Sequence, residues 1–181
     1  DFIIRIERCT GTPKEEIGRY AFETARYLPD GADDPAFVLN EARYRGAQIL
    51  VCGAFFGTGS SREMAVWAIA GMGIRCVIAP SFGEIFFGNC VQNGVLPIRL
   101  SPETVERLLE RLAAAPADAP LQATLTVDLG ACRITTPWGE AIGFEADYRY
   151  LIHDRDSIFA RNLDESIKGF GLRVLKSPPQ S

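Results

Sequence analysis

The stretch AQILVCGAFFGTGSSREMAVWAIAGMG, residues 47–73, contains a strand, a turn and a helix in succession. Its apolar run over 47–52 predicts a short buried strand. The glycine-rich residues 53–59 predict a turn, and 61–72 predict a helix. Because a strand that leads directly into a helix begins a crossover unit, this stretch favours an α/β fold.

Two features of the predicted helix bear on its surroundings. Ser60 and Glu63 stand in the spacing of a capping box, which predicts Ser60 as the N-cap residue. The side chains of 64–70 are apolar on every side, so we expect the helix to be covered all round, by its own domain or by a partner. Gly71 and Gly73 should end it.

The alternation of strand and helix continues along the chain. Further strands are predicted at 74–79 and 95–100. Ser81 and Glu84 repeat the capping-box spacing at the start of one helix, and Ser-Pro-Glu at 101–103 starts another. Strand–helix pairs in succession predict parallel crossover units.

The two ends of the chain follow other patterns. Residues 15–27 favour a short helix within an irregular N-terminal part. Apolar and polar residues alternate over 121–129 and 132–136, and a further apolar run follows at 142–145, which predicts antiparallel strands. One more helix is expected from Ile152 onward.

Composition bounds the class of protein. The 181 residues fit a single domain over 1–181, and 47% hydrophobic with 23% charged residues exclude bulk disorder. The formal net charge of −4 argues against nonspecific binding to nucleic acid or to an anionic membrane. No apolar run approaches the roughly 18–20 residues that span a bilayer, and no secretory leader is expected.

The metal-ligating side chains are few and scattered. The five cysteines include no C-x-x-C pair, and His153 is the single histidine. This argues against a disulfide framework and against a self-contained zinc or iron–sulfur site. Reduced thiols and a cytoplasmic location are therefore expected.

Chemistry is concentrated at the glycine turn, where GTGSSRE spans 57–63. Glycines let backbone N–H groups approach a ligand, and a helix start adds unpaired N–H groups and partial positive charge. With two hydroxyls and a guanidinium, the turn suits a carboxylate or a phosphate. The P-loop and dinucleotide fingerprints do not match. An anion site and a plain capped helix both stay open on the pattern alone.

Four segments carry a family resemblance: 37–40, 49–63, 76–82 and 89–98. In this order and spacing they resemble the small subunit of 3-isopropylmalate dehydratase, the swivelling domain of the aconitase superfamily. The resemblance implies an α/β fold, a swivelling three-layer β/β/α domain with parallel crossover units and an antiparallel C-terminal hairpin. It also implies loss and re-addition of water on a hydroxy-dicarboxylic acid, in leucine biosynthesis. A separate large subunit would carry the [4Fe–4S] cluster, so this chain would hold no metal.

The resemblance also implies residue roles. Ser60 matches the general base that takes a proton from carbon, and Ser61 and Arg62 match the residues that bind a substrate carboxylate. Gly59 would bring the backbone close to the substrate. These groups must be within reach of the companion subunit.

The N-terminal residues have two possible registers on the family. In one, Asp1 matches an aspartate of the proton relay, and Arg5 and Arg8 fall in or near the loop that tunes substrate choice. In the other, 2–8 aligns with a later family stretch.

Two other functions stay open. Met64 replaces a frequent histidine, which motivates the same chemistry on another hydroxy-diacid, such as citramalate, dimethylmalate or homocitrate. A stand-alone module that binds anions without catalysis is the other alternative.

Overall fold

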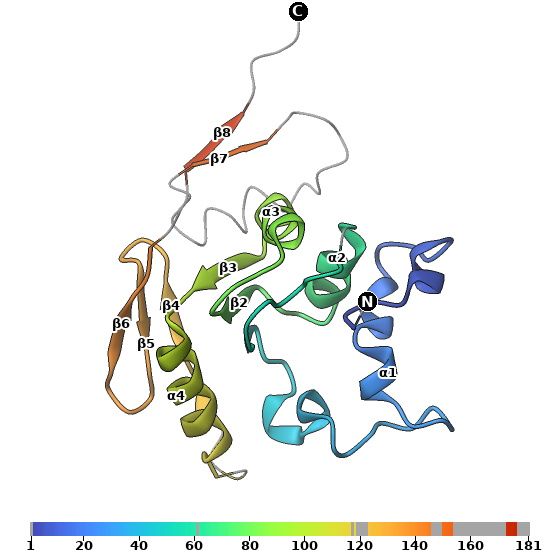
Figure 1. The fold of residues 1–181 in the computed structure, drawn as a ribbon, viewed down its shortest axis with the longest axis horizontal. Coiled ribbons are helices and arrows are strands. Elements are labelled where there is room, and N and C mark those ends of the chain that lie inside the picture. Colours follow the sequence, from blue (N-terminus) through green and yellow to red (C-terminus); the bar gives the residue numbers. More distant parts are fainter. Residues whose placement is uncertain are drawn as a thin grey trace, which may run out of the picture. The chain divides into compact units, whose positions relative to one another are not determined.

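The protein was studied as a computed structural model, which describes residues 2–60, 62–116, 118 and 123–145 and the backbone of the last two strands (Figure 1). Contacts divide the chain into two compact units, Asp1–Thr124 and Leu125–Ser181. Each unit is described by itself below. The single domain predicted over 1–181 stays a prediction.

The first unit is built on a parallel sheet of three strands in the order β1-β2-β3 (Figure 1). The strands are β1 (Ile49–Val51), β2 (Cys76–Ala79) and β3 (Leu96–Arg99). Leu50 pairs with Val77, and Ile78 pairs with Ile98. All four residues of β2 are buried, as expected for the central strand. The predicted parallel crossover units are confirmed, with each strand shorter than its apolar run.

Three helices follow the three strands. They are α2 (Met64–Gly71), α3 (Glu84–Gln92) and α4 (Pro102–Ala113). The first two end in the same way, with a left-handed glycine at Gly73 (φ +100°) and at Gly94 (φ +72°). After each glycine the next N–H bonds back into the helix, from Ile74 to the Ile69 carbonyl (3.2 Å) in α2. Glycine is favoured here because a side chain rarely adopts this conformation.

The helix start predicted at 101–103 is confirmed, and Ser101 is its N-cap residue. Its hydroxyl accepts the Thr104 N–H at 3.3 Å at the start of α4. The Ser60 cap is wrong, because α2 begins only at Met64 and has no side-chain cap. The Ser81 cap is also wrong, because the N-cap residue of α3 is Gly83, again without a side-chain bond.

Helix α2 is covered on one side by its own chain. The 3-10 helix η2 (Ile17–Tyr20) packs against it, as does α3. The backbones of Gly18 and Gly71 approach so closely that a Cβ on Gly18 would lie 2.5 Å from the carbonyl carbon of Gly71. Four residues of α2 are buried, namely Ala65, Val66, Ala68 and Ile69, whereas Met64, Trp67 and Ala70 stay partly exposed.

The helix predicted over 15–27 is wrong as a single helix. Phe22 adopts a left-handed conformation (φ +57°) and separates η2 from α1 (Glu23–Arg26). Its N–H bonds to the Ile3 carbonyl at 2.8 Å, and its buried ring lies against Phe2 and Phe37. Further 3-10 helices are η1 (Ile6–Cys9), η3 (Val38–Asn40) and η4 (Ala42–Tyr44).

The second unit contains an antiparallel sheet and a pair of parallel strands. The antiparallel strands are β4 (Thr126–Asp128), β5 (Arg133–Thr135) and β6 (Ala141–Gly143), and the parallel pair is β7 (Tyr150–His153) and β8 (Arg173–Lys176). The antiparallel prediction is confirmed by the β4-β5-β6 order. Ile152 lies in β7, and the helix predicted to follow falls on residues outside the described ones. No helix in the described part of the chain is both long and apolar enough to cross a bilayer.

Candidate functional site

The glycine loop, residues 53–62, leaves the carboxyl end of β1 and leads to α2. In open parallel sheets, ligands bind beyond the carboxyl ends of the strands. Phe55, within the loop, has a left-handed backbone (φ +59°) and is 73% exposed. The loop therefore presents a side chain and strained backbone at the edge where an α/β site is expected.

The segment that follows β2 holds the glycine loop in place. The Phe55 N–H donates to the Ser81 hydroxyl at 2.8 Å, and the Phe56 N–H donates to the Ser81 carbonyl at 3.1 Å. The Gly83 N–H returns a bond to the Phe56 carbonyl at 2.9 Å. Ser81 thus satisfies a loop N–H instead of capping α3, which is why the capping-box spacing misled.

Ser81 is the positioning residue that the sequence reasoning missed. The available signal was topological rather than local. Loops after neighbouring parallel strands meet at the same sheet edge, so a hydroxyl just after β2 is placed to bond the loop after β1.

The two loop glycines, Gly57 and Gly59, have different roles. A Cβ on Gly57 (φ +75°) would lie 2.2 Å from Cγ of Phe86, which is fully buried. Gly59 (φ +88°) is exposed, and a Cβ there would meet nothing within 4 Å. Gly57 therefore allows the loop to pack directly on the buried Phe86 ring. Gly59 leaves the backbone of the loop uncovered at the surface.

The remaining candidate residues of the loop differ in exposure. Arg62 is exposed, whereas Ser60 is buried, with 3% of its surface accessible. The Ser60 N–H bonds to the Gly57 carbonyl at 3.0 Å, which holds it in the turn rather than at the helix start. Ser61 lies outside the described residues. In the chain by itself, Arg62 is therefore open to solvent and Ser60 is not.

The N-terminal candidates are placed on or beside η1. Arg5 is exposed, and its Nε lies 3.4 Å from Oε2 of Glu7. Arg8 makes a two-point contact with Glu23, with Nε 3.0 Å from Oε2 and Nη2 2.5 Å from Oε1. Hydrogen bonding between the two raises the pKa of Arg8 and lowers that of Glu23. Asp1 is outside the described residues, and the roles predicted for Asp1, Arg5 and Arg8 stay predictions.

The described side chains do not form a metal centre. Among them, no three His, Cys, Asp or Glu groups gather closely enough to hold an ion. All five cysteines are free. Burial raises the pKa of the Cys52 and Cys76 thiols to about 12 and raises that of Cys90 as well. These three are therefore packing groups rather than nucleophiles, since the thiolate is the reactive form.

This chain is similar in sequence and fold to known proteins. A family model described as the aconitase C-terminal domain matches residues 10–103. The 3-isopropylmalate dehydratase small subunit of Paramagnetospirillum magneticum is 49% identical over 147 residues, 81% of this chain and 71% of the relative. The protein of the same name from Methylobacterium radiotolerans is 50% identical over 131 residues, 72% of this chain and 63% of the relative. The crystal structure of 3-isopropylmalate dehydratase (leuD) from Methanocaldococcus jannaschii has a similar fold, with a TM-score of 0.56 and 24% identity. The match covers 80% of this chain and 72% of that chain.

Proposed function

We propose, from the premise that this chain belongs to the family of 3-isopropylmalate dehydratase small subunits, that it completes a heteromeric hydro-lyase acting on isopropylmalate. The resemblance drawn from the sequence is thereby confirmed at the level of the family. The observation that carries the proposal is the glycine loop, which places Gly59 and Arg62 exposed beyond the carboxyl end of β1.

Arg62 is assigned the role of binding a substrate carboxylate. Its exposed guanidinium offers paired N–H donors that match the two oxygens of a carboxylate. Gly59 leaves backbone beside it uncovered, so the substrate can approach closely. Ser61 is proposed to add a hydroxyl donor to the same carboxylate.

Ser60 is assigned as the general base that takes the proton from the substrate carbon. Dehydration removes a proton from one carbon and hydroxide from its neighbour, so that a C–H and a C–O bond break and a C=C bond forms. The proton goes to the deprotonated Ser60 oxygen, and the reverse reaction returns it. A serine can act in this way only where positive charge and N–H donors lower its pKa, and Arg62 is two residues away.

The burial of Ser60 adds a condition to this assignment. Because only 3% of the residue is accessible in the chain alone, its oxygen can reach a substrate only after residues 57–62 change conformation. We propose that docking of the large subunit supplies that change. The loop is suited to it, since Gly59 is exposed and a Cβ there would have no neighbour within 4 Å.

The large subunit and its cluster are part of the proposal. The described residues of this chain do not form a cluster site. On the family resemblance, we assign the [4Fe–4S] cluster to the large subunit, where it would supply a Lewis acid for the leaving hydroxyl. A cytoplasmic location is proposed because the five cysteines are free. The proposed partners are the large subunit and a small hydroxy-diacid, with neither nucleic acid nor membrane.

The test is reconstitution of the chain with a cognate large subunit. Ser60→Ala should lower kcat by roughly 10²–10⁴-fold while complex formation is kept, as expected for loss of a general base. Thr58→Ala is the matched control, because it removes an exposed hydroxyl from the same loop, and it should keep kcat within about twofold. Full activity of Ser60→Ala would overturn the base assignment. A panel of isopropylmalate, citramalate, dimethylmalate and homocitrate identifies the substrate.

A further inference from the structure

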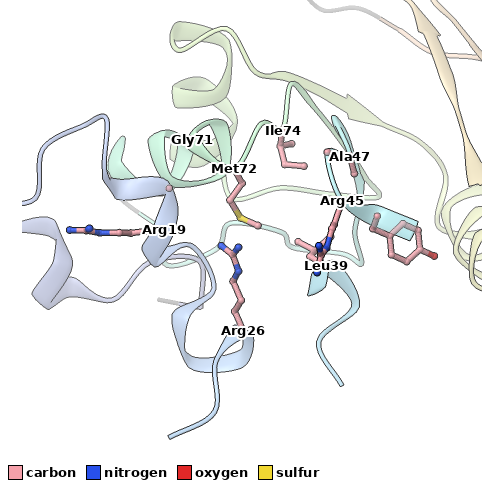
Figure 2. Close-up of a pocket in the computed structure, with 11 residues that line it drawn as sticks. Arg19, Arg26, Leu39, Arg45, Ala47, Gly71, Met72 and Ile74 are labelled. Carbon is pink, nitrogen blue, oxygen red and sulfur yellow. The ribbon is translucent and has the colours of Figure 1, made fainter. Parts of the chain in front are cut away.

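A pocket of about 350 Å³ opens at the amino edge of the parallel sheet, the edge opposite to the glycine loop. Ala47 lines it two residues before β1, and Ile74 lines it two residues before β2. The N-terminal segment contributes Gly18 and Arg26 to the lining. Figure 2 shows Arg26 together with Ala47 and Ile74. The pocket therefore lies entirely within the first unit.

All the described charged residues that line the pocket are positive. Arg19, Arg26 and Arg45 line the pocket, and none of its lining residues is acidic. Arg19 is paired with Glu16, and in Figure 2 its side chain extends away from Met72 and the other pocket residues. Two guanidinium groups are left to act on the pocket, those of Arg26 and Arg45.

Arg26 has a donor with no acceptor. Its Nε is buried and has no hydrogen-bond partner among the described residues. Its guanidinium contacts the Tyr27 ring, at 5.2 Å from the centroid, which does not satisfy an N–H. A buried N–H without an acceptor is costly, so an arginine held in this way is suited to an anion that enters from outside.

Arg45 adds a second positive charge to the pocket. It is exposed, and among the described residues it forms neither an ion pair nor a hydrogen bond through its side chain. The nearby arginine Arg43, in contrast, is occupied by Glu41 (2.8 Å) and by the Ala115 carbonyl (2.6 Å). Arg45 is thus free to meet an anion at the mouth of the pocket.

The rest of the wall is apolar. Leu39, Met72 and Ile74 contribute to it, and Figure 2 shows Arg26 reaching toward Met72. Ligand pockets combine such walls with a few placed polar groups, and about 350 Å³ lies near the lower end of their usual volume. The combination fits a small molecule with a charged head and a short apolar body.

We propose that this pocket binds a small organic oxyanion, with its carboxylate or phosphate head on Arg26 and Arg45 and its apolar body against Leu39, Met72 and Ile74. This binding is independent of the dehydration chemistry proposed for the glycine loop. The charged head and the apolar wall act together, so neither a neutral analogue nor a bare ion would bind as well.

Calorimetric titration of the full chain tests the site with three probes. Butanoate and propyl phosphate carry the two kinds of head on the same propyl body, and butanamide is the neutral control. At least one of the two anions should bind, with butanamide at least tenfold weaker. The stronger anion identifies the head group. Equal binding of butanamide, or binding by neither anion, would overturn the proposal.

Variants locate the bound anion. Arg26→Gln and Arg45→Gln should each weaken binding about tenfold, as expected for loss of one charge-assisted contact. Arg133→Gln removes an exposed charge from β5 and should change affinity less than twofold. Arg62→Gln should also leave it unchanged. Arg45→Gln keeps the test decisive should Arg26→Gln fail to fold. Loss of binding in Arg62→Gln but not in Arg45→Gln would place the anion at the glycine loop and overturn the proposal.

Discussion

At the residue scale, a side chain's partner decides its role more than its spacing does. Ser60, Ser81 and Ser101 all precede helices in capping spacing, yet only Ser101 caps one. Ser81 accepts the Phe55 N–H instead, and Ser60 is buried, with its N–H bonded to the Gly57 carbonyl. The sequence could indicate which residues matter at the glycine loop. It could not predict the burial of Ser60, because the accessible surface of a residue is set by the folded chain and not by the local spacing.

The ion pair between Arg8 and Glu23 gives a prediction in pH. Their hydrogen bond lowers the pKa of Glu23 below its ordinary 4.5, so the folded chain keeps this carboxylate charged at a pH where the unfolded chain protonates it. The pair therefore stabilises the fold above about pH 4.5, and that stabilisation is lost as the pH falls through the folded pKa.

Urea unfolding of Glu23→Gln and of the parent chain from pH 7 to pH 3 measures this effect. The variant should be less stable at pH 7, and the difference should shrink as the pH falls below 4.5. Glu16→Gln is the control, since its pair with Arg19 is exposed on both sides and should contribute little. A difference that does not change with pH would show that packing, rather than charge, explains the cost.

At the element scale, the strands and helices of the crossover units were predictable because apolar runs alternate with glycine stops. Gly73 and Gly94 end α2 and α3 where the sequence places them. The N-terminal helix was not predictable, since its break at Phe22 depends on tertiary contacts with Ile3, Phe2 and Phe37. Local propensity cannot report such contacts.

The packing of η2 on α2 depends on two glycines and gives a second prediction. Gly18→Ala should destabilise the chain by roughly 2–4 kcal/mol, because its Cβ would lie 2.5 Å from the backbone of Gly71 and a backbone cannot move aside cheaply. Chemical denaturation measures the free energy of unfolding.

Gly88→Ala in α3 is the matched control. A Cβ there meets nothing within 4 Å, and alanine favours a helix over glycine by about 0.5–1 kcal/mol, so this variant should be more stable than the parent. Equal effects of the two substitutions would show that η2 and α2 do not pack as closely as described.

At the scale of the whole molecule, the family could be identified from motifs. Which side chains the fold buries or brings together could not be. The segment from Gly57 to Arg62 leads into α2 beyond the carboxyl end of β1, as the strand–turn–helix pattern predicts. The arginine-lined pocket at the opposite edge had no local signal, because its residues come from segments as far apart as Gly18 and Ile74. Side chains that converge in this way become visible only when the chain is folded.

The central claim is that Ser60 exchanges a proton with substrate carbon once the large subunit is bound. The most direct measurement is exchange of that carbon-bound hydrogen in D₂O, followed by NMR or mass spectrometry on the reconstituted complex. We expect the parent and Thr58→Ala to incorporate deuterium, and Ser60→Ala to assemble and bind substrate without incorporating it. Deuterium incorporation by Ser60→Ala at the parent rate would contradict the account.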